Sequence, residues 1–132
     1  MLPTLFVVDD DEIDRKIIER AVKRSGVALD TMFFSMSEAM IDHLAAPGAA
    51  PPQAIFIDLN MPRKDGLEVV ADLQAAHPEI VGDAEIYIVT SSINPQDIER
   101  AEANPNVSGY VEKPVRKTDI AALFGGLGGQ LA

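Results

Sequence analysis

Residues 54–66 read AIFIDLNMPRKDG, and the rest of the chain is best interpreted from this stretch. Its four leading apolar residues, 54–57, are typical of a parallel strand that is buried on both faces. Pro62 cannot continue such a strand, and Gly66 marks the far side of a loop. Asp58 therefore lies where a buried strand opens into a loop, at the edge where open α/β sheets bind ligands. The alternative is an Asp58 that only caps a turn.

The length and composition favour one globular domain with an acidic surface. The chain has 132 residues and a formal net charge of -10, which argues against nucleic acid or an anionic membrane as a direct partner. Cysteine is absent, which excludes disulfides and thiolate chemistry and fits a cytoplasmic location. The first residues, MLPTLFVVDDD, do not resemble a signal peptide, and no stretch approaches the ~18 apolar residues of a membrane span.

A second buried-strand pattern, LFVV at residues 5–8, also ends in carboxylates. Asp9, Asp10 and Asp11 follow it directly. Asp11 is well placed to cap the amphipathic helix that comes next, and Gly26 is a plausible end for that helix. This capping role does not require Asp9 and Asp10, so their side chains remain to be explained.

The remaining pattern alternates strands and helices. Further strands are predicted at 29–34, 84–89 and 107–111, and further helices at 37–44, 67–77, 95–103 and from about 118. Ser37 and Asn94 are the predicted N-caps of two of these helices. Four glycines between 125 and 129 weaken the last helix. Five strand–helix repeats predict a parallel sheet covered by helices on both faces.

In such a sheet the carboxyl ends of all strands share one edge. That edge collects Asp9 and Asp10 from the first strand, Asp58 from the third, Thr90 from the fourth and Lys113 from the fifth. Because like charges repel, it is unfavourable for three carboxylates this close together to be ionised at once without a cation. Hard oxygen ligands of this kind suit Mg²⁺.

The same edge has the groups that phosphoryl chemistry requires. A carboxylate can attack phosphorus and form an aspartyl phosphate. The phosphoryl group then needs a cation and hydrogen-bond donors, for which Mg²⁺, Lys113 and the Thr90 hydroxyl are available. The first, third, fourth and fifth strands thus end in an acid, an acid, a hydroxyl and a lysine. This combination is far more specific than any one of these residues alone.

The pieces VVDDD, IDLNMPRKDG, IVTSS and GYVEKP give the chain a resemblance to the response-regulator receiver family of two-component signalling. The resemblance covers nearly the whole chain. It implies an α/β flavodoxin-like (βα)5 three-layer sandwich with strand order 2-1-3-4-5. It also implies one receiver domain over residues 1–132, of the stand-alone type without an attached output domain.

The resemblance also assigns roles at the sheet edge. Asp58 is the implied phosphoacceptor, and its carboxylate, that of Asp10 and the backbone carbonyl of Asn60 are the implied ligands of Mg²⁺. Asp9 is implied to bind the metal through water. Lys113 is implied to pair with the phosphoryl group. The implied activity is not that of a turnover enzyme, because the protein catalyses only its own phosphorylation and slow dephosphorylation.

Further roles concern signalling. Thr90 and Tyr110 are the implied switch residues, and the alternative for Tyr110 is an ordinary half-buried strand aromatic. Asn60 and Ser92 are implied to flank the water that removes the phosphate and so to set its lifetime. The implied donor is a sensor histidine kinase or a histidine phosphotransfer protein. The downstream partner is another protein or a second copy of the chain, and neither nucleic acid nor membrane is expected to bind.

Two alternatives stay open. Residues 9–11 also satisfy the Asp-x-Asp opening of haloacid dehalogenase-like phosphatases, with Asp9 as nucleophile and Asp11 as acid–base residue. Those enzymes carry an acidic motif after their lysine, whereas only Asp119 lies beyond Lys113, and the Asp58 loop would have no role. The second alternative is a receiver-like module that acts without phosphorylation.

Overall fold

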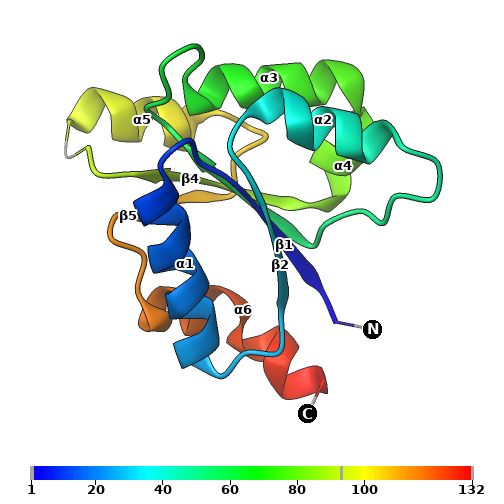
Figure 1. The fold of residues 1–132 in the computed structure, drawn as a ribbon. Coiled ribbons are helices and arrows are strands. Elements are labelled where there is room, and N and C mark those ends of the chain that lie inside the picture. Colours follow the sequence, from blue (N-terminus) through cyan, green and yellow to red (C-terminus); the bar gives the residue numbers. More distant parts are fainter. Residues whose placement is uncertain (1, 93, 132) are drawn as a thin grey trace.

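The computed structural model describes residues 2–92 and 94–131, with side chains described to Gly125 in the last helix. Five parallel strands form one sheet in the order β2-β1-β3-β4-β5 (Figure 1). The strands are β1 (Thr4–Val8), β2 (Asp30–Phe34), β3 (Ala54–Asp58), β4 (Glu85–Thr90) and β5 (Gly109–Glu112). The flavodoxin-like fold and strand order predicted from the sequence are confirmed, with strand bounds that differ by one or two residues.

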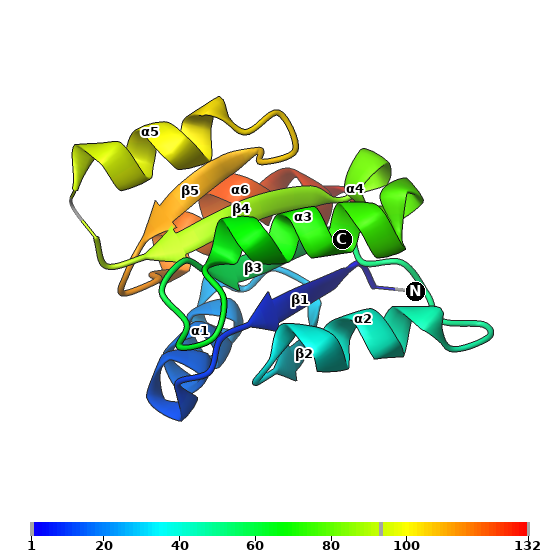
Figure 2. The same ribbon diagram turned by 90° about the horizontal axis from the view of Figure 1, so that it is seen from above.

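Helices cover both faces of the sheet and complete a three-layer sandwich. Figures 1 and 2 show α1 and α6 on one face and α2, α3 and α5 on the other. The helices are α1 (Glu12–Ser25), α2 (Ser37–Ala45), α3 (Gly66–Ala76), α4 (Pro78–Asp83), α5 (Pro95–Ala103) and α6 (Lys117–Leu131). Among the helices of the described residues, none has the length and apolar character needed to cross a bilayer.

The sheet separates two hydrophobic cores. Successive strand side chains point to opposite faces, so Ile55 and Ile57 pack with α2, α3 and α5, whereas Phe56 packs with α1 and α6. All five residues of β3 are buried. Burial on both faces is the reason that the central strands are continuously apolar in the sequence. Because the strands are parallel, they deliver the polar residues that follow them to one edge.

Most of the predicted helix ends are confirmed. Asp11 Oδ1 accepts a hydrogen bond from the backbone N–H of Ile13 at 2.8 Å and caps α1. Gly26 ends α1 in the left-handed conformation, with φ of 74°, which glycine adopts at little cost. Asn94 Oδ1 accepts from the N–H of Gln96 at 2.9 Å and caps α5.

The predicted cap of α2 is wrong. Met36 precedes the helix without a side-chain capping bond, and Ser37 is already the first helical residue. The Ser37 hydroxyl donates to Glu38 Oε1 at 2.9 Å. A capping side chain must precede the first helical residue in order to accept from the N–H groups of the first turn, and Ser37 lies one position too late.

The helix predicted over 67–77 is confirmed as α3, and a short helix that the sequence did not predict follows it. Helix α3 stops at Ala76, and Pro78 begins the short helix α4 before β4 starts. Proline is favoured at the first position of a helix, because that position needs no N–H donor. The proline that ends one helix therefore also starts the next. At the other end of the chain, α6 continues through its glycines to Leu131.

Candidate functional site

Lys113 lies at the centre of the polar sheet edge. Its Nζ donates to Asp14 Oδ2 at 2.7 Å and to Asp9 Oδ2 at 3.0 Å, and lies 3.2 Å from Asp58 Oδ1. The Lys113 side chain is only 13% exposed, so water screens these ion pairs poorly. One ammonium group therefore connects the ends of β1 and β3 with the first turn of α1.

Three carboxylates form an acidic cluster at this edge. Asp9, Asp10 and Asp58 each offer an oxygen, and these oxygens all lie within 4.8 Å of one another. Asp9 and Asp58 are buried, whereas Asp10 faces solvent. Oxygen donors with one side open to water fit a hard divalent cation such as Mg²⁺, which keeps some of its water. The sequence-predicted acids are thus brought together as expected.

Burial and mutual repulsion perturb the ionisation of this cluster. Burial, with the negative charge of Asp9 adding to it, raises the pKa of Asp58 to about 6. Burial likewise raises the pKa of Asp9. Desolvation disfavours the Lys113 ammonium, but its hydrogen bonds to Asp14 and Asp9 outweigh this, and its pKa lies above the usual value. A single ammonium leaves excess negative charge here, which a bound cation would neutralise.

The loop after β3 returns closely onto the phosphoacceptor candidate. A Cβ atom at Gly66 would lie 2.7 Å from the carbonyl oxygen of Asp58 and 3.1 Å from the Cα of Leu59. The N–H of Gly66 donates to the Leu59 carbonyl at 2.8 Å. Asp65 then caps α3 in a reciprocal capping box with Glu68. Only a residue without a side chain fits at 66, which explains the glycine.

Thr90 connects the two loops that flank Asp58. It is 2% exposed, and its Oγ1 accepts from the N–H of Ser92 at 2.9 Å and from Asn60 Nδ2 at 3.4 Å. The Ser92 hydroxyl in turn donates to Asp97 Oδ2 at 2.7 Å, which ties this loop to α5. The Thr90 hydroxyl can still donate its own hydrogen to an additional acceptor.

Tyr110 lies one strand away from Thr90, on the same face of the sheet. It pairs in register with Ile88 of β4, and it packs partly buried against the core beneath α5. It also lines a pocket of about 300 Å³ with Asp119 and Leu123 of α6. Tyr110 therefore lies on the α5–β5–α6 side of the molecule, one strand away from Thr90.

Two contacts at the site escape the sequence interpretation. Asp14, on α1, is the closest carboxylate partner of Lys113. Arg15 donates to the Asp9 backbone carbonyl at 2.7 Å and so fixes the end of β1. No signal near Asp14 in the sequence indicates its contact, because Lys113 lies 99 residues away in the chain.

Comparisons with known proteins agree with this geometry. Residues 5–124 match the model of the response regulator receiver domain family. Response regulator Rcp1 of Synechocystis sp. is 24% identical over 127 residues, covering 93% of this chain and 84% of Rcp1. A structure of Rcp1 in its Mn²⁺-bound form has a TM-score of 0.70 at 23% identity, covering 95% of this chain and 91% of that one.

A response regulator receiver protein from Dyadobacter fermentans is also similar, with a TM-score of 0.79 at 27% identity over 93% of this chain and 95% of its own. The family match spans all five strands and the whole acidic edge. Receiver domains are phosphoacceptor signalling proteins rather than conventional enzymes. The chain belongs to the response regulator receiver domain family of two-component signalling.

Proposed function

We propose that this protein is a response regulator that accepts a phosphoryl group on Asp58 from a phosphohistidine donor. The observation that carries the proposal is the position of Lys113 Nζ, 3.2 Å from Asp58 Oδ1 and held there by Asp9 and Asp14. A cation fixed beside a nucleophilic carboxylate is what a transferring phosphoryl group requires.

The transfer makes and breaks one bond at phosphorus. A carboxylate oxygen of Asp58 bonds to phosphorus as the bond from phosphorus to the histidine nitrogen of the donor breaks, and that nitrogen keeps the electron pair. Asp58 must be unprotonated to attack; burial raises its pKa to about 6 in the metal-free protein, and a bound cation would favour the charged form. Lys113 pairs with the phosphoryl oxygens. Positioning and charge supply the catalysis, as in other phosphoryl transfers.

The acidic cluster is the proposed Mg²⁺ site. The carboxylates of Asp10 and Asp58 and the backbone carbonyl of Asn60 would hold the ion, with Asp9 acting through water. The ion would supply positive charge for the phosphoryl oxygens. Support comes from the three carboxylates gathered within 4.8 Å and from the Mn²⁺-bound form of the related Rcp1.

Thr90 and Tyr110 are the proposed switch. Phosphorylated Asp58 offers new acceptor oxygens, toward which the Thr90 hydroxyl donates. This movement alters the hydrogen bonds from Ser92 and Asn60 and frees space into which Tyr110 turns. The α5–β5–α6 side then changes shape and binds a downstream protein or a second copy. Two discrete packings can amplify such a small shift.

Asn60 and Ser92 are the proposed determinants of phosphate lifetime. Neither side chain is a strong general base, so the aspartyl phosphate is hydrolysed slowly. The Ser92 hydroxyl is further constrained by its bond to Asp97 and by the N–H of Asn94, which donates to it at 3.1 Å. These bonds hold the loop beside the path of an attacking water.

One experiment tests the proposed function directly. Wild type, Asp58→Asn and Asp9→Asn are incubated with acetyl phosphate and Mg²⁺, and intact mass is measured. We expect one phosphoryl group on wild type and none on Asp58→Asn. Equal uptake by both would refute Asp58 as the acceptor. Retention of uptake in Asp58→Asn together with its loss in Asp9→Asn would instead support the phosphatase alternative.

A further inference from the structure

Three carboxylates share the ammonium group of Lys113, and that of Asp14 on α1 is the closest of them. The distances from Lys113 Nζ are 2.7 Å to Asp14 Oδ2, 3.0 Å to Asp9 Oδ2 and 3.2 Å to Asp58 Oδ1. An ammonium group has three N–H donors, so three carboxylates can occupy all of them. A phosphoryl group on Asp58 can therefore gain a second bond from Lys113 only if another carboxylate gives one up.

The three carboxylates differ in what it costs them to lose Lys113. The Asp9 side chain is 1% exposed, so without Lys113 it would be a buried and unpaired charge, which is strongly unfavourable. Asp58 is itself the proposed attachment point of the phosphoryl group. The Asp14 side chain is 29% exposed, so water can solvate it in place of the lysine. Asp14 is therefore the partner that Lys113 can leave at the lowest cost.

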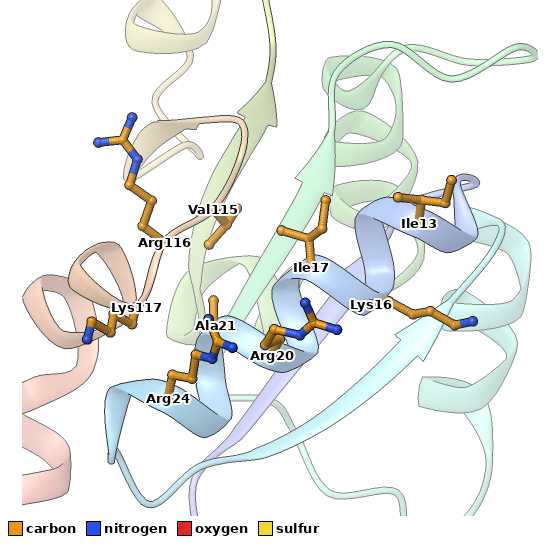
Figure 3. Close-up of a pocket in the computed structure, with 9 residues that line it drawn as sticks. All are labelled: Ile13, Lys16, Ile17, Arg20, Ala21, Arg24, Val115, Arg116 and Lys117. Carbon is orange, nitrogen blue, oxygen red and sulfur yellow. The ribbon is translucent and has the colours of Figure 1, made fainter.

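Packing holds Asp14 within reach of Lys113 in the unphosphorylated protein. Ile17 of α1 and Val115 line a cavity of about 10 Å³ together with both members of the pair. A cavity of this size has room for about one water molecule at most. Figure 3 shows Ile17 and Val115 on the two sides of the groove between α1 and the segment that leads into α6. The first half of α1 is thus fixed against the segment that follows β5.

The charge of Asp14 acts in the same direction as its hydrogen bond. A phosphoryl group on Asp58 brings further negative charge to an edge that already holds the carboxylates of Asp9 and Asp10. Asp14 repels this charge, and it also competes with the phosphoryl oxygens for the lysine. Both effects favour the unphosphorylated protein.

We propose that Asp14 is a positioning residue that restrains Lys113 in the unphosphorylated protein and competes with the phosphoryl group for it. The inference rests on the proposed function, because it concerns the lysine that is proposed to pair with phosphorylated Asp58. On phosphorylation, Lys113 keeps its bond to Asp9, leaves Asp14 and donates to a phosphoryl oxygen instead. Asp14 thereby lowers the affinity of the site for a phosphoryl group.

The affinity for beryllofluoride, a mimic of the phosphoryl group, measures this competition without a kinase. Asp14→Asn removes the charge but keeps an oxygen that can accept from Lys113. With Mg²⁺ present, we expect Asp14→Asn to bind beryllofluoride about fivefold more tightly than wild type. Labelling of Asp58 by acetyl phosphate should become faster as well. Asp14→Glu keeps the carboxylate and should stay within about twofold of wild type.

Glu12→Gln is the matched control for net charge. It removes one negative charge in the same helical turn, from a side chain that is 70% exposed. We expect a change of less than about twofold, which disappears as ionic strength rises. The effect of Asp14→Asn should persist in high salt, because Lys113 is only 13% exposed. A purely structural contact would give no increase in affinity. Equal gains in Asp14→Asn and Glu12→Gln, or no gain in Asp14→Asn, would overturn the proposal.

A measurement on wild type tests the exchange of partners even if a variant fails to fold. The NMR signal of the Asp14 carboxylate carbon is followed as beryllofluoride is added. We expect this signal to move, because Asp14 loses its donor, while that of the Glu12 carboxylate stays in place. An unmoved Asp14 signal in protein that binds beryllofluoride would overturn this inference alone. If wild type binds no beryllofluoride and acetyl phosphate leaves Asp58 unmodified, the proposed function fails, and this inference fails with it.

Discussion

Lys113 Nζ lies closer to Asp14 Oδ2, at 2.7 Å, than to Asp58 Oδ1, at 3.2 Å. The lysine is therefore positioned by helix α1 as well as by the strand ends. Asp14 is 29% exposed and Lys113 is 13% exposed, so this bond is partly shielded from water. It gives α1 a direct influence on the group that is proposed to pair with the phosphoryl.

Removing the Asp14 charge should destabilise the fold measurably. Asp14→Asn is expected to lower the free energy of unfolding by about 1–2 kcal/mol, because a partly buried hydrogen bond between charged groups is weakened. Glu12→Gln, in the same helical turn but with a 70% exposed side chain, should change it by less than about 0.5 kcal/mol. Urea melts of both variants check this, and similar losses would contradict a special role for Asp14.

Asp10 should matter for the metal rather than for the metal-free fold. Without Mg²⁺, Asp10→Ala should be no less stable than wild type, because a solvent-facing charge that repels Asp9 and Asp58 is removed. Added Mg²⁺ should stabilise wild type and have a much smaller effect on Asp10→Ala. Urea melts with Mg²⁺ and with EDTA measure both effects. An unchanged Mg²⁺ effect in Asp10→Ala would count against this residue as a ligand.

The raised pKa of Asp58 predicts a pH-dependent gain in stability for Asp58→Asn in EDTA. Between the ordinary pKa of 3.8 and the folded value of about 6, the folded state holds a proton that the unfolded state has lost. Wild type therefore loses stability as pH rises through this window. The free energy of unfolding of Asp58→Asn relative to wild type should therefore increase up to pH 6 and then level off at about 2–3 kcal/mol. Asp42→Asn, at an exposed position, is the control for the substitution itself. A stability gain of Asp58→Asn that decreases with rising pH would contradict the raised pKa.

Ser92 should control how long the phosphate lasts. Ser92→Arg is expected to slow its loss by about threefold or more, since the larger side chain occupies the approach of water, while phosphorylation by acetyl phosphate proceeds; a tenfold change would correspond to 1.4 kcal/mol in the barrier. Ser91→Arg, at the exposed neighbouring position, serves as the control. The decay of the phosphorylated mass gives both rates. Equal decay in the two variants would remove Ser92 from the lifetime proposal.

The output route can be followed with beryllofluoride, which mimics the phosphoryl group on Asp58. We expect amide chemical shifts to change at Tyr110 and along α5 as well as in the loops around the site, because Thr90 connects to α5 through Ser92 and Asp97. Asp58→Asn, which cannot form the adduct, is the control. Changes confined to the loops that carry Asp9, Asp58 and Lys113 would refute this route.

The sequence predicts the strand ends well for a clear physical reason. A parallel strand buried on both faces must be apolar until it leaves the sheet, so the first polar residue, such as Asp58 or Thr90, marks the functional edge. Lys113 directly follows β5, but β5 is an edge strand that already ends in the exposed Glu112, so this rule alone does not identify Lys113.

The features that the sequence does not predict depend either on contacts between distant parts of the chain or on ambiguous local signals. Nothing near Asp14 in the chain shows that Lys113 lies opposite it, 99 residues away. The start of α4 is hidden because Pro78 is also a helix-ending signal. The misplaced cap at Ser37 reflects a one-residue offset, a scale at which helix ends are weakly encoded.

The tight return of the loop at Gly66 has a consequence for how this protein tolerates mutation. Any side chain at 66 would push against the backbone of Asp58 and Leu59, so it would displace the proposed acceptor without changing any acidic residue. A mutational survey scored only by signalling would place Gly66 beside the reactive residues, although it contributes no chemical group. At this position, the absence of a Cβ atom is what allows the backbone of Asp58 to hold its place.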